Sequence, residues 1–349
     1  MKALRLYGVR DIRYEDAPDP VIEKDDDVII KVKAVGICGS DISRYRNLGP
    51  YVKGMVWGHE FSGEVVEVGK GCKRIAVGDR VVGCPNMVCH KCKYCLSGHP
   101  SRCENLNTIG ALVPGAYAEY IKLPELNLIK MVPGMTFEEG ALTEPATVAI
   151  HGLYQSNIQM GYTVAVVGCG NIGLMAIEWA KAFGAKTVYA MDVNDKQLEK
   201  AKSFGADVTI NTRDVDFYEA IHKYCDGVDL AIESAGNPFT AARVLGLPHK
   251  GGEVVYCGIP YGDVPVPRFY FEKIMRSELQ IHGSWCTVSA PYPGKEWENA
   301  VDYIGNHKVH VTQMITHQRN MSEGPAIFEQ IMENPGNFGK VLLYPEENR

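Results

Sequence analysis

Hydrophobic residues follow two different patterns along this chain. From residue 162 to about residue 283, short apolar runs rich in β-branched residues alternate with stretches whose apolar residues recur at helical spacing. This alternation predicts six strands joined by helices, the pattern of a doubly wound parallel sheet. The predicted strands are residues 163–167, 187–191, 208–211, 228–233, 253–257 and 279–282, with helices at 172–183, 196–204, 217–224 and 239–245.

The segments on either side have another pattern. In residues 1 to about 150, alternating runs such as 28–35, 61–68 and 118–122 are separated by Gly, Pro and Asp, which predicts a barrel-like all-β domain. After residue 283 we expect two helices, at 297–304 and 324–332, and a closing strand at 339–344. The predicted organisation is therefore an α/β protein with domains 1–150 and 151–285, followed by a segment 286–349 that could return to the first domain.

Three glycines follow the first strand of the alternating segment at G-x-G-x-x-G spacing. We expect Gly168 to make the tight turn, Gly170 to let backbone approach a pyrophosphate, and Gly173 to let the helix pack closely on the strand. Asn171 and Ile172 would open that helix, whose free N–H groups suit phosphate. The pattern predicts dinucleotide binding; the alternative is a glycine-rich turn that binds nothing.

Asp192 stands at the end of the next predicted strand, close to the offset of a ribose-binding acid. Its carboxylate would accept hydrogen bonds from the adenosine ribose hydroxyls and repel a 2′-phosphate. No arginine follows it directly, so we expect NAD as the cofactor and not NADP.

Length and charge limit the possible partners. A chain of 349 residues should form two domains, and a net charge of −6 argues against a nucleic-acid or anionic-membrane partner. The N-terminus has no apolar signal core, and no apolar run approaches the roughly 20 residues that cross a bilayer. We expect a cytoplasmic protein that acts on a small molecule.

Four of the eleven cysteines lie close together in C-x2-C-x2-C-x7-C spacing. Four thiolates are enough for one tetrahedral Zn²⁺ and leave no open position, so we predict a structural zinc. The loop is poor in apolar residues, and a bound metal would supply its order. An iron–sulfur cluster and unmetallated thiols are the alternatives. The four residues are Cys89, Cys92, Cys95 and Cys103.

A second set of possible ligands is dispersed along the chain. Cys38, His59 and Glu144 offer one sulfur, one nitrogen and one oxygen, which would leave a catalytic position open for water or substrate. We expect Glu144 at the N-cap of a helix because Pro145 suits a first helical position. Asp41 could accept the second ring N–H of His59. Each residue by itself is more often structural, and such ligands would accept several divalent ions.

In this order, Cys38-Gly-Ser-Asp, Gly58-His-Glu, the four-cysteine segment and the glycine motif resemble the zinc-dependent medium-chain dehydrogenases over essentially the whole chain. The resemblance implies a GroES-like β-barrel catalytic domain, an inserted Rossmann domain and a catalytic zinc at the cleft between them. The Cys–His–Glu set is similar to that of the polyol dehydrogenase branch. In some relatives the glutamate at the position of Glu60 approaches the metal.

The resemblance also implies a reaction, in which zinc polarises a secondary hydroxyl and a hydride passes to NAD. The hydroxyl of Ser40 would begin a proton relay. Ser43 stands where some alcohol dehydrogenases have the histidine that ends this relay, so the exit of the proton stays open.

Segments 283–285 and 291–297 resemble the members of the branch that act on a phosphorylated sugar alcohol, which implies oxidation of galactitol 1-phosphate to tagatose 6-phosphate. Alternatives are an unphosphorylated polyol or diol (sorbitol, xylitol, 2,3-butanediol), a pentitol phosphate, or a non-catalytic NAD(H)-binding sensor. By resemblance we also expect a homodimer or homotetramer. The candidate substrate residues, each with an ordinary surface or core role as the alternative, are Arg44, Arg46, Tyr51, Trp285 and Lys295.

Overall fold

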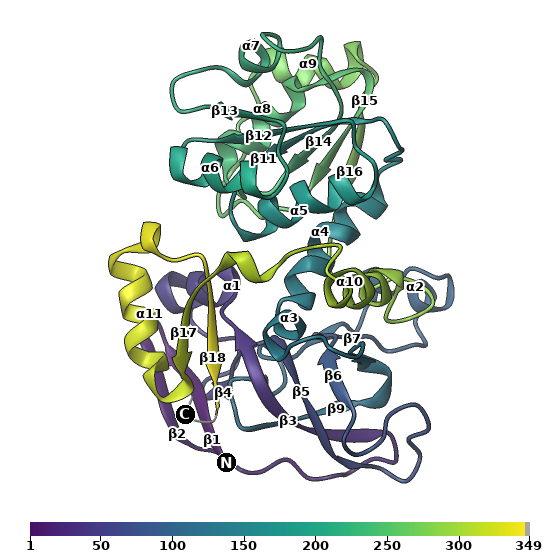
Figure 1. Ribbon diagram of the computed structural model, residues 1–349, viewed down its shortest axis with the longest axis vertical. Helices are drawn as coiled ribbons and strands as arrows, with labels where there is room; N and C mark the ends of the chain where they lie inside the picture. Colours follow the sequence, from purple (N-terminus) through teal and green to yellow (C-terminus); the bar gives the residue numbers. More distant parts are fainter. Residues whose placement is uncertain (346–349) are drawn as a thin grey trace. The chain divides into compact units, whose positions relative to one another are not determined.

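The computed structural model describes residues 1–345 and separates into two compact units (Figure 1). One unit consists of Met1–Thr147 together with Thr287–Arg349, and the other of Val148–Cys286. The first unit is therefore built from both ends of the chain.

A six-stranded sheet forms the centre of the unit Val148–Cys286, and all of its strand pairs are parallel. The predicted doubly wound parallel sheet is confirmed. Its strand order reverses between the first strand and the fourth, which is where such sheets bind ligands at their carboxyl ends. In sheet order the strands are β13 (Val208–Asn211), β12 (Thr187–Asp192), β11 (Thr163–Val167), β14 (Val228–Glu233), β15 (Pro248–Tyr256) and β16 (Gln280–Gly283).

Both faces of this sheet are covered. Ala165 and Val167 on one face of β11 belong to a hydrophobic cluster with Phe217 and Tyr270. Val164 and Val166, whose side chains point to the opposite face of β11, are buried as well. Strands buried on both sides need continuous apolar runs, which is why the sequence pattern located them. The helices of this unit are α5 (Asn171–Ala182), α6 (Asp195–Ser203), α7 (Phe217–Ile221), α8 (Pro238–Arg243) and α9 (Arg268–Arg276).

In this unit the sequence pattern missed one helix, α9, and misjudged some element ends. Helix α9 was not predicted, because several of its apolar side chains, such as Phe271 and Met275, are exposed and show no buried stripe. Strand β15 begins at Pro248, five residues before the predicted start, since Gly251 and Gly252 interrupt the apolar run. Helix α7 ends at Ile221, three residues before its predicted end.

The other unit is built on a long strand, β3 (Asp27–Gly36), at the centre of a seven-stranded sheet. Its antiparallel partners are β5 (Glu60–Val68), β9 (Tyr120–Pro124) and the C-terminal strand β18 (Lys340–Tyr344). The sheet also contains β6 (Arg80–Gly83), β10 (Leu128–Lys130) and β17 (Ile315–Asn320), and a three-stranded sheet consists of β1 (Lys2–Gly8), β2 (Asp11–Asp16) and β4 (Met55–Val56).

The helices of this unit are short, and its mainly aliphatic core contains several large aromatic side chains. Tyr117, Phe61 and Phe328 are among the largest fully buried side chains of the cluster between the sheets. Phe328 comes from α11 (Gly324–Glu333), which lies beside β2 (Figure 1). The other helices are α1 (Gly39–Ser43), α2 (Lys93–Leu96), α3 (Phe137–Ala141) and α10 (Lys295–Gly305), while α4 (Thr143–Gln155) contains the boundary between the units.

The predicted N-cap position of Glu144 is wrong. Helix α4 begins at Thr143, and Glu144 lies in its first turn. The N–H of Ala146 already donates to Leu142 O, so helical hydrogen bonding starts before Pro145. A proline fits anywhere in the first turn, because those N–H groups have no partner within the helix.

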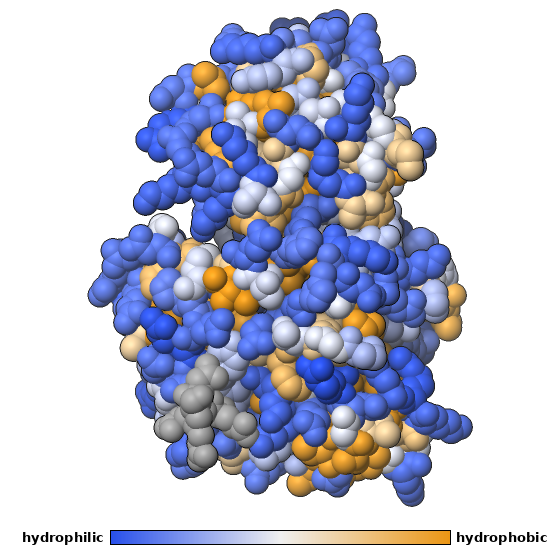
Figure 2. All heavy atoms as spheres, viewed as in Figure 1, coloured by the Kyte–Doolittle hydropathy of each residue, from blue (hydrophilic) through white to orange (hydrophobic). Residues whose placement is uncertain are grey.

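Hydrophilic residues dominate the face drawn in Figure 2, where hydrophobic residues gather in small separate groups. Among the described residues, no helix combines the length and the hydropathy that crossing a membrane would need.

A histidine–carboxylate pair in the parallel sheet makes stability depend on pH. His249 Nε2 lies 3.0 Å from Asp229 Oδ1, and this hydrogen bond raises the pKa of His249. A raised histidine pKa stabilises the folded state fully below the unfolded value of about 6.5, and the effect is lost as pH rises through the folded value. We therefore expect His249→Gln to lower the urea midpoint at about pH 6 and to have a smaller effect at about pH 8.5. Asp229, whose pKa is lowered, stays ionised across this window.

The matched control for this comparison is His222→Gln. His222 is an exposed histidine of the same unit whose Nδ1 lies 2.8 Å from a backbone carbonyl, Tyr218 O, instead of a carboxylate. A loss of stability in His249→Gln that is the same at both pH values would contradict the assignment.

Candidate functional site

The turn between β11 and α5 depends on two of its three glycines for reasons internal to the chain. Gly168 has φ +90°, and a Cβ there would lie 2.8 Å from Ala235. A Cβ on Gly173 would lie 1.8 Å from Gly168 O, so only glycine lets α5 pack onto the turn. By contrast, a Cβ on Gly170 would meet nothing within 4 Å. The chain itself leaves space at the N-terminus of α5, which fits the close approach of a dinucleotide phosphate.

The carboxylate of Asp192 is held beside this turn. Its Oδ2 accepts the N–H of Cys169 at 2.7 Å and its Oδ1 accepts the N–H of Asn194 at 2.9 Å. Each carboxylate oxygen has a further lone pair, so both can still accept a hydroxyl. Helix α5 begins at Asn171, one residue before the predicted start at Ile172, so both residues lie in its first turn.

One residue that contacts this turn was not predicted from the sequence. The hydroxyl of Ser234, at the end of β14, lies 2.9 Å from both Val167 O and Gly168 O. It therefore ties the fourth strand of the unit to the glycine turn. No local sequence signal identifies this serine, since its partners lie 66 and 67 residues away.

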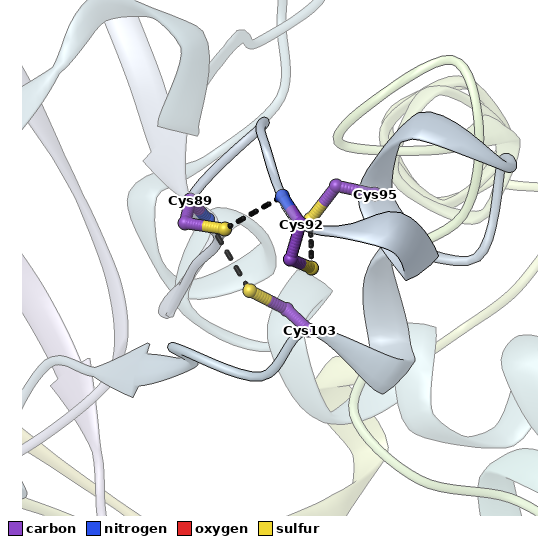
Figure 3. A group of neighbouring side chains, drawn as sticks. All are labelled: Cys89, Cys92, Cys95 and Cys103. Carbon is purple, nitrogen blue, oxygen red and sulfur yellow. Dashed lines mark hydrogen bonds between the residues drawn. The ribbon is translucent and has the colours of Figure 1, made fainter.

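The four clustered cysteines lie together in the loop between β7 (Asn86–Met87) and β8 (Asn107–Thr108), where their sulfur atoms point toward one another (Figure 3). The ligand atoms of Cys89, Cys92, Cys95 and Cys103 all lie within 4.8 Å of each other. Backbone N–H groups point at the sulfurs: Cys92 N is 3.4 Å from Cys89 Sγ, and Cys89 N is 3.3 Å from Cys103 Sγ. Hydrogen bonding from the Lys91 backbone lowers the pKa of Cys89 to about 6. Four sulfurs at this spacing fit a tetrahedral Zn²⁺.

A second group of donors forms where β3 and β5 meet. The ligand atoms of Cys38, His59 and Glu60 lie within 4.8 Å of one another. Cys38 follows the end of β3, and His59 precedes the start of β5. Antiparallel pairing places Gly36 opposite Glu60 and so joins the two segments. A Cβ on Gly36 would lie 2.2 Å from Glu60 Oε2, so glycine is needed for this approach.

Glu144 lies near this group but outside the 4.8 Å set. Burial raises its pKa to about 7, and the charges of His59 and Glu60 also act on it. Burial alone would lower the pKa of His59, but the charges of Cys38 and Asp41 raise it well above its usual value. Negative groups thus surround the imidazole. Thiolate, imidazole and carboxylate together are a donor set that fits a catalytic Zn²⁺.

Asp41 does not make the hydrogen bond expected from the sequence. Its Oδ1 lies 3.8 Å from His59 Nδ1, which is too long for a hydrogen bond. Its Oδ2 instead accepts the Tyr117 hydroxyl at 2.6 Å and the Cys38 N–H at 3.1 Å. Asp41 therefore faces the histidine while it is fixed by other partners.

Lys340 is a site residue that sequence reasoning missed. Its side chain is 2% exposed, and Nζ lies 2.8 and 2.6 Å from the two oxygens of Glu60 and 3.2 Å from Ile37 O. Burial alone would lower the pKa of Lys340, but the charge of Glu60 outweighs it and raises the pKa. The sequence shows Lys340 as a charged residue at the start of the apolar strand β18, but nothing in the sequence indicates that Glu60 is its partner.

The remaining predicted residues lie at or near the surface. Ser40 is exposed in α1, two residues after Cys38, and Arg46 and Lys295 are exposed as well. The guanidinium of Arg44 lies 3.4 Å from the ring centroid of Tyr51 and donates to Gly49 O at 3.2 Å. Tyr51 is 58% exposed. Trp285 is 59% exposed, so the alternative of a core tryptophan is excluded.

Known proteins share this combination of units. Residues 24–133 match the alcohol dehydrogenase GroES-like domain, and residues 171–306 match the zinc-binding dehydrogenase family. Sorbitol dehydrogenase of Bacillus subtilis (strain 168) is 34% identical over 353 residues, covering 99% of this chain and 97% of that protein. The chain belongs to the zinc-type medium-chain alcohol dehydrogenases. The predicted family, its two-domain fold with a GroES-like unit and a Rossmann unit, and its oxidoreductase character on CH–OH groups are confirmed.

Two further members of the family are similar over nearly the whole chain. Galactitol 1-phosphate 5-dehydrogenase of Escherichia coli (strain K12) is 33% identical over 96% of this chain and 97% of its own. A crystal structure of galactitol-1-phosphate dehydrogenase from Escherichia coli superposes with a TM-score of 0.94, covering 99% of this chain and 100% of that one. A putative zinc-binding dehydrogenase from Sinorhizobium meliloti 1021, bound to NADP, is 32% identical with a TM-score of 0.87 and 99% coverage of both chains.

The buried ion pair gives a first test of this zinc-type dehydrogenase. Lys340→Met leaves the carboxylate of Glu60 buried without its cation, so we expect the free energy of unfolding to fall by about 3–5 kcal/mol. Glu60→Gln in the same chain should recover part of the loss. Urea denaturation followed by fluorescence measures both changes.

Lys130→Met provides the control, because Lys130 pairs with Asp79 in the same unit and half of its side chain is exposed. Exposed pairs contribute at most about 1 kcal/mol. Equal losses in the two single variants would show that burial of the Lys340–Glu60 pair is not what stabilises this region.

The cysteine cluster gives a second test. Cys92→Ser removes one of four ligands, so we expect the purified protein to lose about one zinc ion per chain and to unfold at lower temperature. Atomic absorption and calorimetry measure the two effects. Cys72→Ser, a change at a cysteine outside both donor groups, should alter neither quantity. A Cys92→Ser protein with unchanged zinc content and melting temperature would exclude a structural zinc here.

Proposed function

We propose that this protein is an NAD-dependent polyol-phosphate dehydrogenase that oxidises galactitol 1-phosphate to tagatose 6-phosphate at a secondary hydroxyl. The observation that carries the reaction type is the group of donors at the junction of β3 and β5, in a chain whose other unit holds a dinucleotide turn. The substrate rests on the likeness to galactitol 1-phosphate 5-dehydrogenase over nearly the full chain.

In this proposal Cys38, His59 and Glu144 hold the catalytic zinc, and Glu60 is an alternative ligand. The placement of Glu60 supports this division of roles, because both of its oxygens are bound to Lys340. The buried carboxylate of Glu144 instead interacts with the charge of His59, which opposes the rise that burial causes in the pKa of Glu144. A zinc ion bound there supplies Lewis acidity that lowers the pKa of the substrate hydroxyl. Cys89, Cys92, Cys95 and Cys103 hold a second, structural zinc.

The other residues bind substrate and move its proton. The exposed hydroxyl of Ser40 accepts the first proton of the relay. Ser43 is occupied by its bond to Gly39 O at 3.1 Å, which argues for a different exit from the relay. Arg44, held in place by its stacking on Tyr51, is positioned to bind a substrate phosphate, and Lys295 and Trp285 are further candidates.

The Rossmann unit binds NAD in this proposal. Gly168 and Gly173 shape the turn, and Gly170 leaves room for the pyrophosphate at Asn171 and Ile172. Asp192, fixed by two backbone N–H groups, accepts the ribose hydroxyls and repels the extra phosphate of NADP. The nicotinamide supplies the hydride acceptor. The second candidate substrate is a sorbitol-type polyol, because a similar protein is a sorbitol dehydrogenase. The second candidate cofactor is NADP, because a similar structure is bound to it.

We further propose a homodimer or homotetramer. Strand β16 forms one edge of the parallel sheet, and its Ile281 is largely exposed, so this edge offers backbone groups and apolar surface to a second chain.

Steady-state formation of reduced cofactor tests the proposal. We expect kcat/KM for galactitol 1-phosphate to exceed that for galactitol, sorbitol, xylitol and 2,3-butanediol by about tenfold or more, since one charge-assisted phosphate contact is worth about 1.5–3 kcal/mol. An arabitol phosphate should give an intermediate value, and NAD should be preferred to NADP.

Equal or better activity on free polyols would overturn the phosphate assignment. A protein that binds NADH but oxidises no alcohol would favour the non-catalytic sensor. Cys38→Ser is the control for the metal-dependent step, because it should abolish turnover while NAD binding, measured by fluorescence, stays intact.

A further inference from the structure

We propose that Tyr117 is a positioning residue for the Cys38–His59 metal site, and that its hydroxyl sets the affinity of this site for zinc. The role of Tyr117 rests on the proposed ligand set. Its side chain touches both segments that carry the ligands.

The hydroxyl of Tyr117 fixes the orientation of Asp41. Tyr117 is completely buried, and its hydroxyl donates to Asp41 Oδ2 at 2.6 Å. The same oxygen accepts the N–H of Cys38 at 3.1 Å, which leaves Oδ1 facing His59. The carboxylate is thus bound on one side by the backbone of one ligand and turned toward the ring of the other. Without the phenol, one of the two bonds that hold this rotamer is lost.

The ring of Tyr117 supports the second segment. Gly58, directly before His59, has φ +90°, and a Cβ there would lie 2.4 Å from Tyr117 Cδ1. The backbone of Gly58 therefore rests on the ring face. The main chain adds two bonds, from Tyr117 N to Trp57 O at 2.6 Å and from Ala116 N to Gly58 O at 2.9 Å.

Other residues pack against the ring of Tyr117 and fix its position. Phe328 of α11 meets it edge to face, with 6.3 Å between ring centroids, and Leu4 N donates to Tyr117 O at 2.8 Å. Because packing fixes the ring, replacing tyrosine by phenylalanine removes the hydroxyl and leaves the support of Gly58 in place. Tyr117→Phe therefore tests the orientation of Asp41 by the hydroxyl without altering the packing of the aromatic ring.

Groups that orient a metal-binding histidine typically change metal affinity by about 10–100-fold when removed. We expect Tyr117→Phe to raise the zinc dissociation constant of the Cys38–His59 site by about this factor. The full-length protein would be loaded with zinc and titrated with a chromophoric chelator, so that this site and the four-cysteine site are resolved in one experiment. The affinity of the four-cysteine site should not change.

Tyr45→Phe is the matched control. Tyr45 is also buried, its hydroxyl donates to the carboxylate of Glu329, and its ring lies 5.1 Å from that of Phe328, the same ring that supports Tyr117. Both variants lose a phenol–carboxylate bond, which is buried at Asp41 and partly buried at Glu329, so both should lose stability. Only Tyr117→Phe should lose zinc affinity at the Cys38–His59 site. Equal weakening in the two variants, or none in Tyr117→Phe, would overturn the inference.

A double variant tests whether Tyr117 acts through Asp41. If it does, the effects of Tyr117→Phe and Asp41→Asn on zinc affinity should not add when the two changes are combined. Should Tyr117→Phe not fold, Asp41→Asn alone must reproduce the loss of affinity, and an unchanged affinity would overturn the inference. Saturating zinc should also restore the turnover of Tyr117→Phe.

The experiments distinguish a failure of the proposed function from a failure of the role of Tyr117. Wild-type protein that binds zinc at Cys38 and His59 and yet oxidises no alcohol would refute the function and leave the role of Tyr117 intact. Wild-type protein that binds zinc only at the four cysteines would refute both.

Discussion

The antiparallel pairing of β3 with β5 is the constraint on which the rest of the candidate site depends. With Gly36 opposite Glu60, the residues that follow one strand and precede the other must meet, and Cys38 and His59 are those residues. A shift of one residue would turn every side chain of the strand to the other face, so the buried faces of both strands fix the register. The candidate metal ligands are therefore positioned by the hydrophobic core.

Burial of charge around this junction explains its other contacts. Glu60, Asp41 and Glu144 are all buried, and an unpaired buried carboxylate is strongly destabilising. Lys340 neutralises the first, and the second is bound by Tyr117 and Cys38. The third has a raised pKa, as expected where burial acts on a carboxyl group. A divalent cation would complete this arrangement, because it adds positive charge where negative groups already converge.

Most of the parallel-sheet unit could be predicted from the sequence, because strands buried on both faces require continuous apolar runs and glycine turns mark their ends. In the other unit the short helices α1 to α3 and strand β17 were not predicted. Helix α9 escaped, since its apolar residues are exposed and give no buried stripe. Both donor groups could be recognised by residue type. The contacts that orient them could not: Lys340 lies 280 residues from Glu60 and Tyr117 lies 76 from Asp41, and no local pattern identifies either partner.

The position of Lys340 has a consequence for how the protein is made. The strand that carries it, β18, is synthesised long after β3, the strand with which it pairs. Nascent chains fold from the N-terminus onward. Until β18 has been synthesised, Glu60 lacks its cation and β3 lacks one of its neighbouring strands. The surroundings of Cys38 and His59 are therefore completed only once β18 has been made, and a chain that stops before β18 cannot complete them.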